Sequence, residues 1–363
     1  MTAKTESAAP VRVLVVDDSA FMRKMVGEIL NRAGMEVVAV ARDGMDALEK
    51  ARRLRPDVIT LDVEMPRMDG LTFLSELMPT LPTPVVVLSS LASHGAETTI
   101  RCLERGAFDC LHKPSGAISL DIDTIGAEIV AKVQAAARAR RCGAWVARPL
   151  DTGRQITGRQ AKATIHQSSG PVRHTAVVII ASSTGGPGAL QQVLPLLPAD
   201  LQAAVVVVQH LPVGFTAALS KRLDASSALS VREAYAGDTL ERGKVLVAPG
   251  GVHLAFDAER RVTLDHEPPI WGVRPAADVA MRSAAERFGP LAIAVVLTGM
   301  GRDGALGAKA IQQHGGVCIA QDEATSVIFG MPRAALEAGA VDRLLPLDEI
   351  AGAIVEAVEE RGG

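Results

Sequence analysis

The sequence predicts an α/β protein built from two doubly wound domains, and two observations carry this prediction. Short apolar runs alternate with amphipathic helical patterns from residue 11 to residue 141, and the same alternation resumes after residue 174. Strands that alternate with helices favour a parallel sheet with helices on both faces. At 363 residues, the chain is long enough for two such domains, each with its own core.

Residues 11–141 are expected to form a five-stranded parallel sheet with five helices. The strand-like runs are Val11–Val16, Val37–Ala41, Val58–Leu61, Val85–Leu88 and Cys110–Leu111. The helical patterns that follow them are Ala20–Arg32, Met45–Leu54, Leu71–Met78, Ala96–Arg105 and Ile125–Arg141. Gly34 is expected to end the first helix, because glycine tolerates the left-handed conformation found there. The segment before the first strand, residues 1–10, is expected to be disordered.

Residues 142–174 are expected to be a flexible linker, because they lack apolar periodicity and are rich in Gly, Arg, Gln, Ser and Thr. The second domain, residues 175–363, is expected to form a mainly parallel sheet with an antiparallel addition. Its parallel strands are Ala176–Ala181, Ala203–Val208 and Leu291–Leu297. Three shorter runs between turn residues form the expected antiparallel part: Lys244–Ala248, Val252–Phe256 and Val262–Leu264.

Composition excludes several classes of protein. The 38 basic and 41 acidic residues nearly balance, which is unlike a surface for nucleic acid. No apolar run reaches the roughly 18 residues that a membrane span needs. The first ten residues lack the apolar core of a signal peptide, so we expect a cytoplasmic protein without direct membrane insertion. The scattered cysteines (Cys102, Cys110, Cys142 and Cys318) are typical of buried thiols in a reducing compartment.

Polar residues follow four strands of the first domain at the edge where parallel strands end. They are Asp17 with Asp18, Asp62, Ser89 and Lys113. Crowded carboxylates call for a hard cation, and Mg²⁺ accepts one or two of them with water and phosphate oxygens. Asp62 can act as a nucleophile toward a phosphoryl group, while Lys113 and Ser89 can hold its oxygens. The alternative for any single acid is a helix N-cap.

The pattern resembles response-regulator receiver domains over about residues 11–140. The resemblance implies that Asp62 accepts a phosphoryl group from a histidine kinase and that the backbone carbonyl of Glu64 adds a ligand to Mg²⁺. Two residues depart from the usual receiver pattern. Cys110 stands where receivers commonly carry an aromatic switch residue, and His112 directly precedes Lys113. The departures put rotamer switching of an aromatic residue in doubt, but not the phosphorylation chemistry.

The second domain carries a possible hydrolytic triad at strand ends. The strand Ala176–Ala181 runs into small residues from Ser182 to Pro187, a tight corner that can expose Ser183 above the sheet. His210 and Asp303 follow the next two parallel strands, and the three side chains could act as nucleophile, base and orienting acid. A phosphate-binding turn or a simple N-cap remains open for the serine, and a structural role for the histidine.

The same region matches a second motif. Gly299, Gly301 and Gly304 form a GxGxxG sequence after a strand, and Asp322 and Glu323 follow about 20 residues later. This spacing is typical of dinucleotide binding. A dinucleotide fold normally places the motif after its first strand, however, whereas here it falls late in the domain.

Four segments in this order resemble the catalytic domain of chemotaxis protein-glutamate methylesterases. They are Ser182–Pro187, Gln209–Thr216, Ala248–His253 and Leu297–Gly304. With the receiver, the resemblance covers nearly the whole chain outside the linker. It implies a phosphorylation-activated serine esterase that needs no cofactor, releases methanol from methylated chemoreceptors and deamidates receptor glutamines. The alternative is a phospho-switched binding protein without hydrolytic activity.

The resemblance also implies a role for individual residues. By this resemblance the nucleophile is Ser183 rather than Ser182, His210 is the base and Asp303 is the orienting acid. The backbone N–H of Met300 is the implied oxyanion donor. Thr184 and His253 are the implied lining of the cleft. Two departures from the family pattern are visible. Ala181-Ser182 stands where Gly-Ala is common, and Arg302 stands where asparagine is frequent. Arg302 would add positive charge at the mouth of the site and alter substrate preference.

Overall fold

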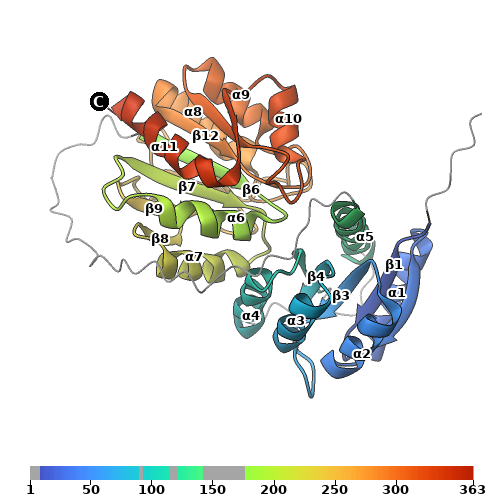
Figure 1. Cartoon of the computed structure of the whole chain (residues 1–363). Coiled ribbons are helices and arrows are strands. Elements are labelled where there is room, and N and C mark those ends of the chain that lie inside the picture. Colours follow the sequence, from blue (N-terminus) through green and yellow to red (C-terminus); the bar gives the residue numbers. More distant parts are fainter. Residues whose placement is uncertain (1–8, 90–92, 114–120, 142–175, 363) are drawn as a thin grey trace, which may run out of the picture. The chain divides into compact units, whose positions relative to one another are not determined.

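The computed structural model describes residues 9–89, 93–113, 121–141 and 176–362 (Figure 1). The chain falls into two compact units, Met1–Leu150 and Asp151–Gly363, which are described separately. Residues 1–8 and the expected linker, 142–174, lie outside the described residues. The disorder expected for the N-terminus and the flexibility expected for the linker therefore stay predictions.

The first unit contains the five-stranded parallel sheet that the sequence predicts. Its elements are β1 (Arg12–Val16), α1 (Ala20–Arg32), β2 (Glu36–Ala41), α2 (Gly44–Leu54), β3 (Val58–Asp62), α3 (Gly70–Thr80), β4 (Val85–Ser89), α4 (Ser93–Glu104), β5 (Asp109–His112) and α5 (Asp121–Arg141). The strand order is β2-β1-β3-β4-β5, and every pair is parallel. The α/β fold class predicted for this part of the chain is confirmed.

Local sequence explains where the helices of this unit begin. The hydroxyl of Ser19 accepts a hydrogen bond from the N–H of Met22 at the start of α1, and the Asp43 carboxylate accepts one from the N–H of Asp46 at the start of α2. Helices α1 and α5 contact each other, and α2, α3 and α4 form a second contiguous group. Both faces of the sheet are thereby covered, which is why β3 and β4 are buried throughout.

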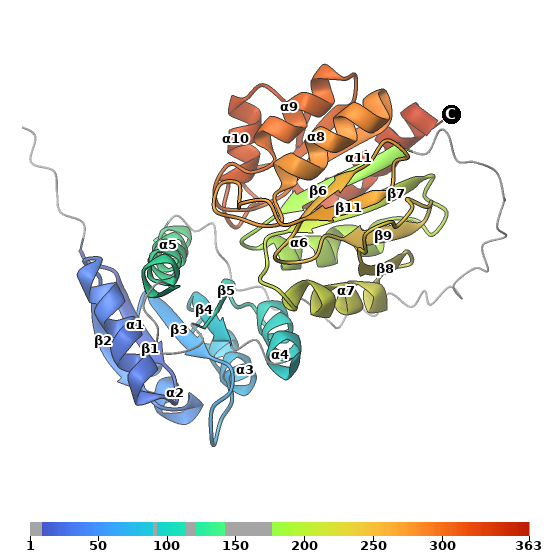
Figure 2. The same cartoon turned by 180° about the vertical axis from the view of Figure 1, so that it is seen from behind.

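The second unit is built on a seven-stranded sheet. Its elements are β6 (Ala176–Ser182), α6 (Gly186–Val193), η1 (Leu194–Leu196), β7 (Ala203–Gln209), α7 (Phe215–Ser226), β8 (Ser230–Glu233), β9 (Lys244–Val247), β10 (His253–Phe256), β11 (Val262–Asp265), α8 (Ala277–Phe288), η2 (Gly289–Leu291), β12 (Ala292–Val296), α9 (Ala305–Gln313), β13 (Val317–Gln321), α10 (Met331–Glu337), β14 (Arg343–Leu345) and α11 (Leu347–Gly362). The order is β14-β13-β12-β6-β7-β9-β8. Helices α8, α9 and α10 cover one face, and α6, α7 and α11 the other (Figures 1 and 2).

The antiparallel part differs in detail from the prediction. The strand β9, expected to be antiparallel, pairs in parallel with both β7 and β8. Residues 234–243 connect β8 to β9 and return the chain to the end of the sheet at which β8 began, as a parallel pair requires. Among the strands that the structure describes, β10 and β11 alone pair antiparallel, and they form a separate two-stranded sheet that contacts α8. Their connection, residues 257–261, has the length of a hairpin loop.

Two predictions from composition can be compared with the described residues. Cys102, Cys110 and Cys318 are buried and free, whereas Cys142 lies outside the described residues. Within the described ranges, no helix combines the length and the apolar character needed to cross a membrane.

Candidate functional site

The strand order of the second unit predicts a ligand-binding crevice at the end of β6. Strand β6 lies between β12 and β7, and the crossovers that leave β6 and β12 run in opposite directions across the sheet. Such a reversal leaves a gap outside the carboxyl ends of the strands, where ligands of open α/β sheets bind. The register aligns the carboxyl ends of the three strands: Val296 of β12 lies beside Ala181 of β6, which lies beside Val208 of β7. The predicted triad residues follow these strand ends.

The corner after β6 distinguishes its two serines. Ser182 is fully buried, and its hydroxyl donates a 2.7 Å hydrogen bond to Oε1 of Gln209. Ser183 is partly exposed, and its hydroxyl makes no hydrogen bond with any residue that the structure describes. A tight turn follows, in which Gly186 donates its N–H to the carbonyl of Ser183 at 2.8 Å and Gly185 adopts a φ of 78°. Ser183 is therefore the serine that presents a free hydroxyl in the crevice.

The structure brings His210 and Asp303 together. Nε2 of His210 lies 2.7 Å from Oδ2 of Asp303. Because Nε2 faces the carboxylate, this nitrogen carries the proton, and Nδ1 is left as the ring nitrogen that can accept another. The backbone N–H of His210 donates to the carbonyl of Ser182 at 3.1 Å, so His210 leaves β7 directly beside the serine corner.

Asp303 is held as an anion at the first turn of α8. It is 2% exposed, and its two oxygens accept the backbone N–H groups of Ala277 at 2.6 Å and Asp278 at 2.9 Å. Burial alone would raise the pKa of this carboxyl, but the His210 hydrogen bond and charge and the two backbone donors outweigh burial and lower the pKa. A buried carboxylate in this position can orient His210 and stabilise its protonated form.

Sequence reasoning missed Gln209, which connects the serine corner to His210. Its side chain is 1% exposed, and its Nε2 donates to the carbonyls of Ser183 at 3.0 Å and of His210 at 3.2 Å. Its Oε1 accepts the hydroxyl of Ser182. A polar residue between an apolar strand and His210 was the available signal, since a buried amide requires partners.

The loop after β12 offers a backbone donor for an oxyanion. The carbonyl of Gly299 accepts the N–H groups of Gly330 at 3.1 Å and Met331 at 2.9 Å, which fixes the loop. A side chain at position 299 would meet Cβ of Ser183 at 2.9 Å, so the loop packs directly on the serine corner. The next N–H, that of Met300, has no acceptor among the described residues. It remains available for a negative charge that develops beside Ser183.

Thr184 and His253 were expected to line the cleft. Thr184 is 2% exposed, and its carbonyl accepts the hydroxyl of Thr298 at 3.0 Å. His253 is 1% exposed, and both of its ring nitrogens contact backbone: Nδ1 accepts from the N–H of Ala276 at 3.1 Å, and Nε2 donates to the carbonyl of Pro268 at 3.1 Å. In this structure, His253 secures the segment before α8 rather than offering a free nitrogen, and its contact with substrate stays a prediction.

The acids of the possible dinucleotide motif have other partners. Asp322 accepts the N–H and the hydroxyl of Thr325 within its own turn. Glu323 forms an ion pair with Arg333 at 2.8 Å. Gly304 begins α9 with a φ of 88°. The glycines therefore serve a strand-to-helix loop, and the acids that would bind a ribose are engaged elsewhere.

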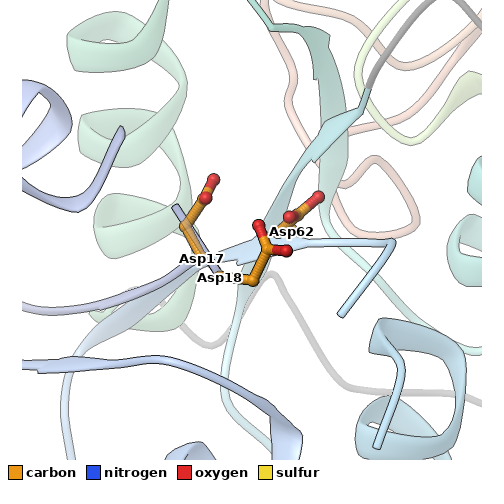
Figure 3. A group of neighbouring side chains, drawn as sticks. All are labelled: Asp17, Asp18 and Asp62. Atoms are coloured by element: carbon orange, nitrogen blue, oxygen red, sulfur yellow. The ribbon is translucent and has the colours of Figure 1, made fainter. Parts of the chain in front are cut away.

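In the first unit, Asp17, Asp18 and Asp62 gather at the carboxyl ends of β1 and β3 (Figure 3). One oxygen of each lies within 4.8 Å of the others. Nζ of Lys113 lies 2.8 Å from an oxygen of both Asp17 and Asp62. The partner of Oδ2 of Asp17 is therefore Lys113, but a single ammonium group cannot balance three carboxylates. The excess negative charge on oxygen ligands fits a divalent cation such as Mg²⁺.

The remaining residues predicted for this site occupy the same sheet edge. Ser89 is buried at the end of β4, and its hydroxyl donates to the carbonyl of Gly95 at 3.3 Å. The backbone N–H of Glu64 donates to Oδ1 of Asp62 at 3.3 Å, which places this loop against the acidic cluster. Cys110 is 2% exposed, and burial strongly raises the pKa of its thiol. Cys110 is thus a small core residue rather than a mobile aromatic ring.

We expect the affinity for Mg²⁺ to depend on the protonation of Asp62. Burial raises the pKa of this carboxyl to about 6; the Asp17 carboxylate adds to the rise, and the Lys113 ammonium opposes it. Below pH 6 the Asp62 carboxyl is protonated and cannot bind the metal. The affinity for Mg²⁺ should therefore fall about tenfold for each pH unit below pH 6 and should level off above pH 7. Calorimetric titration with MgCl₂ from pH 5 to pH 8 measures this. An affinity that is flat over the range would contradict the prediction, and Asp62→Asn should remove this component.

Comparisons with known proteins cover both units. The profile of the response regulator receiver domain matches residues 13–122, and that of the CheB methylesterase matches residues 178–354. A protein-glutamate methylesterase/protein-glutamine glutaminase of Symbiobacterium thermophilum is 51% identical over 360 residues, which are 97% of this chain and 98% of that relative. A protein with the same name from Pyrococcus horikoshii is 48% identical over 358 residues, which are 97% of this chain and 95% of that relative.

A solved structure is also similar to part of this chain. The crystal structure of the Thermotoga maritima CheB methylesterase catalytic domain is 44% identical in sequence and covers 50% of this chain and 97% of its own. The two superpose with a TM-score of 0.49.

Proposed function

The chain belongs to the CheB methylesterase family with an N-terminal receiver domain, and from this premise we propose that it is a phosphorylation-activated serine esterase. Its substrates are glutamate methyl esters on chemoreceptors, and the products are glutamate and methanol. The relatives' name also includes protein-glutamine glutaminase, so we extend the proposal to deamidation of receptor glutamines. One observation carries the proposal: the hydrogen-bonded pair of His210 and Asp303 beside the partly exposed Ser183.

Each residue of the site has a task in forming the acyl-enzyme. The hydroxyl oxygen of Ser183 attacks the ester carbonyl, and Nδ1 of His210 takes its proton. Asp303 holds the histidine in the required tautomer and stabilises the imidazolium that results. The N–H of Met300 donates to the carbonyl oxygen as it becomes negative. His210 then returns the proton to the departing methoxide, and methanol leaves.

Water completes the cycle at the same residues. His210 removes a proton from the attacking water, and the acyl-enzyme breaks down to the glutamate carboxylate and free Ser183. For a glutamine side chain, the leaving group is ammonia in place of methanol. Every proton transfer uses side chains of this chain, so we propose that the esterase requires no cofactor.

The receiver supplies the control. We assign Asp62 as the acceptor of a phosphoryl group from a histidine kinase, with Ser89 and Lys113 binding its oxygens. Asp17, Asp18, Asp62 and the carbonyl of Glu64 would hold Mg²⁺, which neutralises phosphoryl charge when bound. A kinase and methylated chemoreceptors are therefore the proposed partners, and the cytoplasm the proposed location.

Methanol release tests the activity and its control together. A small phosphodonor such as acetyl phosphate with Mg²⁺ should raise release from methylated receptor membranes roughly 5- to 150-fold, a usual range for coupling between two sites. Asp62→Asn should abolish the increase, because its amide cannot be phosphorylated. Asp57→Asn is the matched control, since Asp57 accepts the backbone N–H of Arg12 at the opposite, amino-terminal edge of the same sheet. Activation of Asp62→Asn would rule out Asp62 as acceptor, and absence of methanol from the wild type would favour a phospho-switched binding protein.

A further inference from the structure

An arginine without an acidic partner lies at the rim of the proposed esterase site. Arg302 is exposed and sits between Met300 and Asp303 in the loop after β12. Among the residues that the structure describes, no carboxylate forms an ion pair with it. Instead its guanidinium carbon lies 5.2 Å from the centre of the Trp271 ring, within the range of a cation–π contact.

Trp271 is itself fixed relative to the site. The residue is 50% exposed, yet its Nε1 donates a 2.9 Å hydrogen bond to Oδ2 of Asp278. Asp278 is fully buried, and its other oxygen accepts the N–H of Gly307 at 2.7 Å. A half-exposed aromatic ring with a buried anchor is a preorganised surface, because little side-chain freedom remains to be lost on binding.

Asp278, which anchors Trp271, also contacts Asp303, the residue proposed to orient His210. The N–H of Asp278 donates to Oδ1 of Asp303 at 2.9 Å. The contacts therefore close a ring from Asp303 through Asp278 and Trp271 to Arg302, which is the chain neighbour of Asp303. Such a closed set of contacts holds the guanidinium at a defined place beside the reacting groups. An arginine that served only to keep the protein soluble would not need these contacts.

We infer that Arg302, stacked on Trp271, is a specificity-determining residue that binds a carboxylate close to the scissile ester on the substrate. The inference rests on the proposed function and names the substrate more closely: an acidic protein segment rather than any glutamate methyl ester. Guanidinium groups match carboxylates in geometry, and a stacked guanidinium keeps its N–H edges free to donate.

The reaction product gives this preference a consequence. Hydrolysis converts a neutral ester into a glutamate carboxylate, which is the group that Arg302 recognises. Where two esters lie one helical turn apart, the first hydrolysis creates an acidic neighbour for the second. Demethylation of closely spaced sites then speeds up after the first event.

The experiment uses the full chain with phosphodonor and Mg²⁺. The substrates are receptor cytoplasmic fragments with a single methylated glutamate, which differ only in whether the residue one helical turn away is Asp or Asn. At low salt, the wild type should show a kcat/KM about three- to tenfold higher for the Asp fragment, chiefly through KM. Arg302→Asn should bring the ratio close to one, and Arg302→Lys should restore part of it. Trp271→Leu should reduce it by freeing the guanidinium.

Controls separate charge from structure. Arg287→Asn removes the same charge at the far end of α8, about 14 Å along the helix from Asp278 at 1.5 Å per residue, and should keep the wild-type ratio. Raising the ionic strength should weaken the preference. Equal kcat/KM for both fragments, or a preference that survives Arg302→Asn, overturns the inference while the esterase stands. Failure of the wild type to hydrolyse either fragment overturns the proposed function and this inference with it.

Discussion

Replacing Ser183 by alanine is expected to lower the turnover number for methanol release roughly 10⁴- to 10⁶-fold, the usual cost of losing the nucleophile of a triad. The reason is local. Ser183 presents a hydroxyl without a hydrogen-bond partner among the described residues, next to the His210 backbone, and its removal leaves no group to form the acyl-enzyme. Purified full-length Ser183→Ala, phosphorylated and given methylated receptor membranes, provides the measurement, with circular dichroism to confirm folding.

The neighbouring serine offers the matched control. Ser182 carries the same hydroxyl one residue earlier, but it is buried and bonded to Gln209. Ser182→Ala should therefore retain most of the turnover while losing some stability, because an acceptor on Gln209 is left unsatisfied. If Ser183→Ala kept near wild-type activity, or if Ser182→Ala lost as much, the assignment of the nucleophile would be wrong.

Asp303→Asn is expected to lower turnover roughly 10⁴-fold, the second largest effect. Three N–H groups converge on the two oxygens of this carboxylate, from His210, Ala277 and Asp278. Asparagine has one acceptor oxygen, and its NH₂ group would face at least one of these donors. Either the histidine changes tautomer, and Nδ1 no longer accepts the serine proton, or a backbone N–H at the start of α8 loses its acceptor.

Kinetics and stability measured together distinguish these outcomes. Asp342→Asn is the control, since Asp342 accepts the backbone N–H of Cys318 far along the sheet from His210. Both variants should lower the free energy of unfolding by about 1–3 kcal/mol, as expected when a buried donor loses its acceptor. Only Asp303→Asn should also reduce kcat by orders of magnitude. A similar kcat for the two variants would show that Asp303 is structural and not part of the catalytic machinery.

Much of the fold could be predicted from local sequence. Helix Ala20–Arg32 has the predicted bounds, because Ser19 caps its start and its apolar spacing follows the helical period. The strands of the first unit lie within one residue of their predicted ends, since buried parallel strands read as continuous apolar runs. The error at β9 arose because a short apolar run has the same appearance in either orientation. Its partners are strands far away in sequence.

The candidate site was also predicted in part from local sequence and in part missed. The residue types at the ends of β6, β7 and β12 pointed to Ser183, His210 and Asp303, because the carboxyl ends of parallel strands meet at one edge. The sequence did not reveal the amide of Gln209 between the serine corner and the base, or the backbone partners of His253. These contacts depend on loops that meet only after the sheet has formed.

By itself, the sequence determined the alternation of strands and helices, the chemistry placed at each strand end and the family resemblance, because these are properties of neighbouring residues. Only the tertiary structure decided which serine keeps a free hydroxyl, which nitrogen of His210 faces Asp303 and that Arg302 stacks on Trp271. Each of these depends on contacts between residues at least 27 positions apart in the sequence. The strand order, rather than any local pattern, sets which of those segments become neighbours.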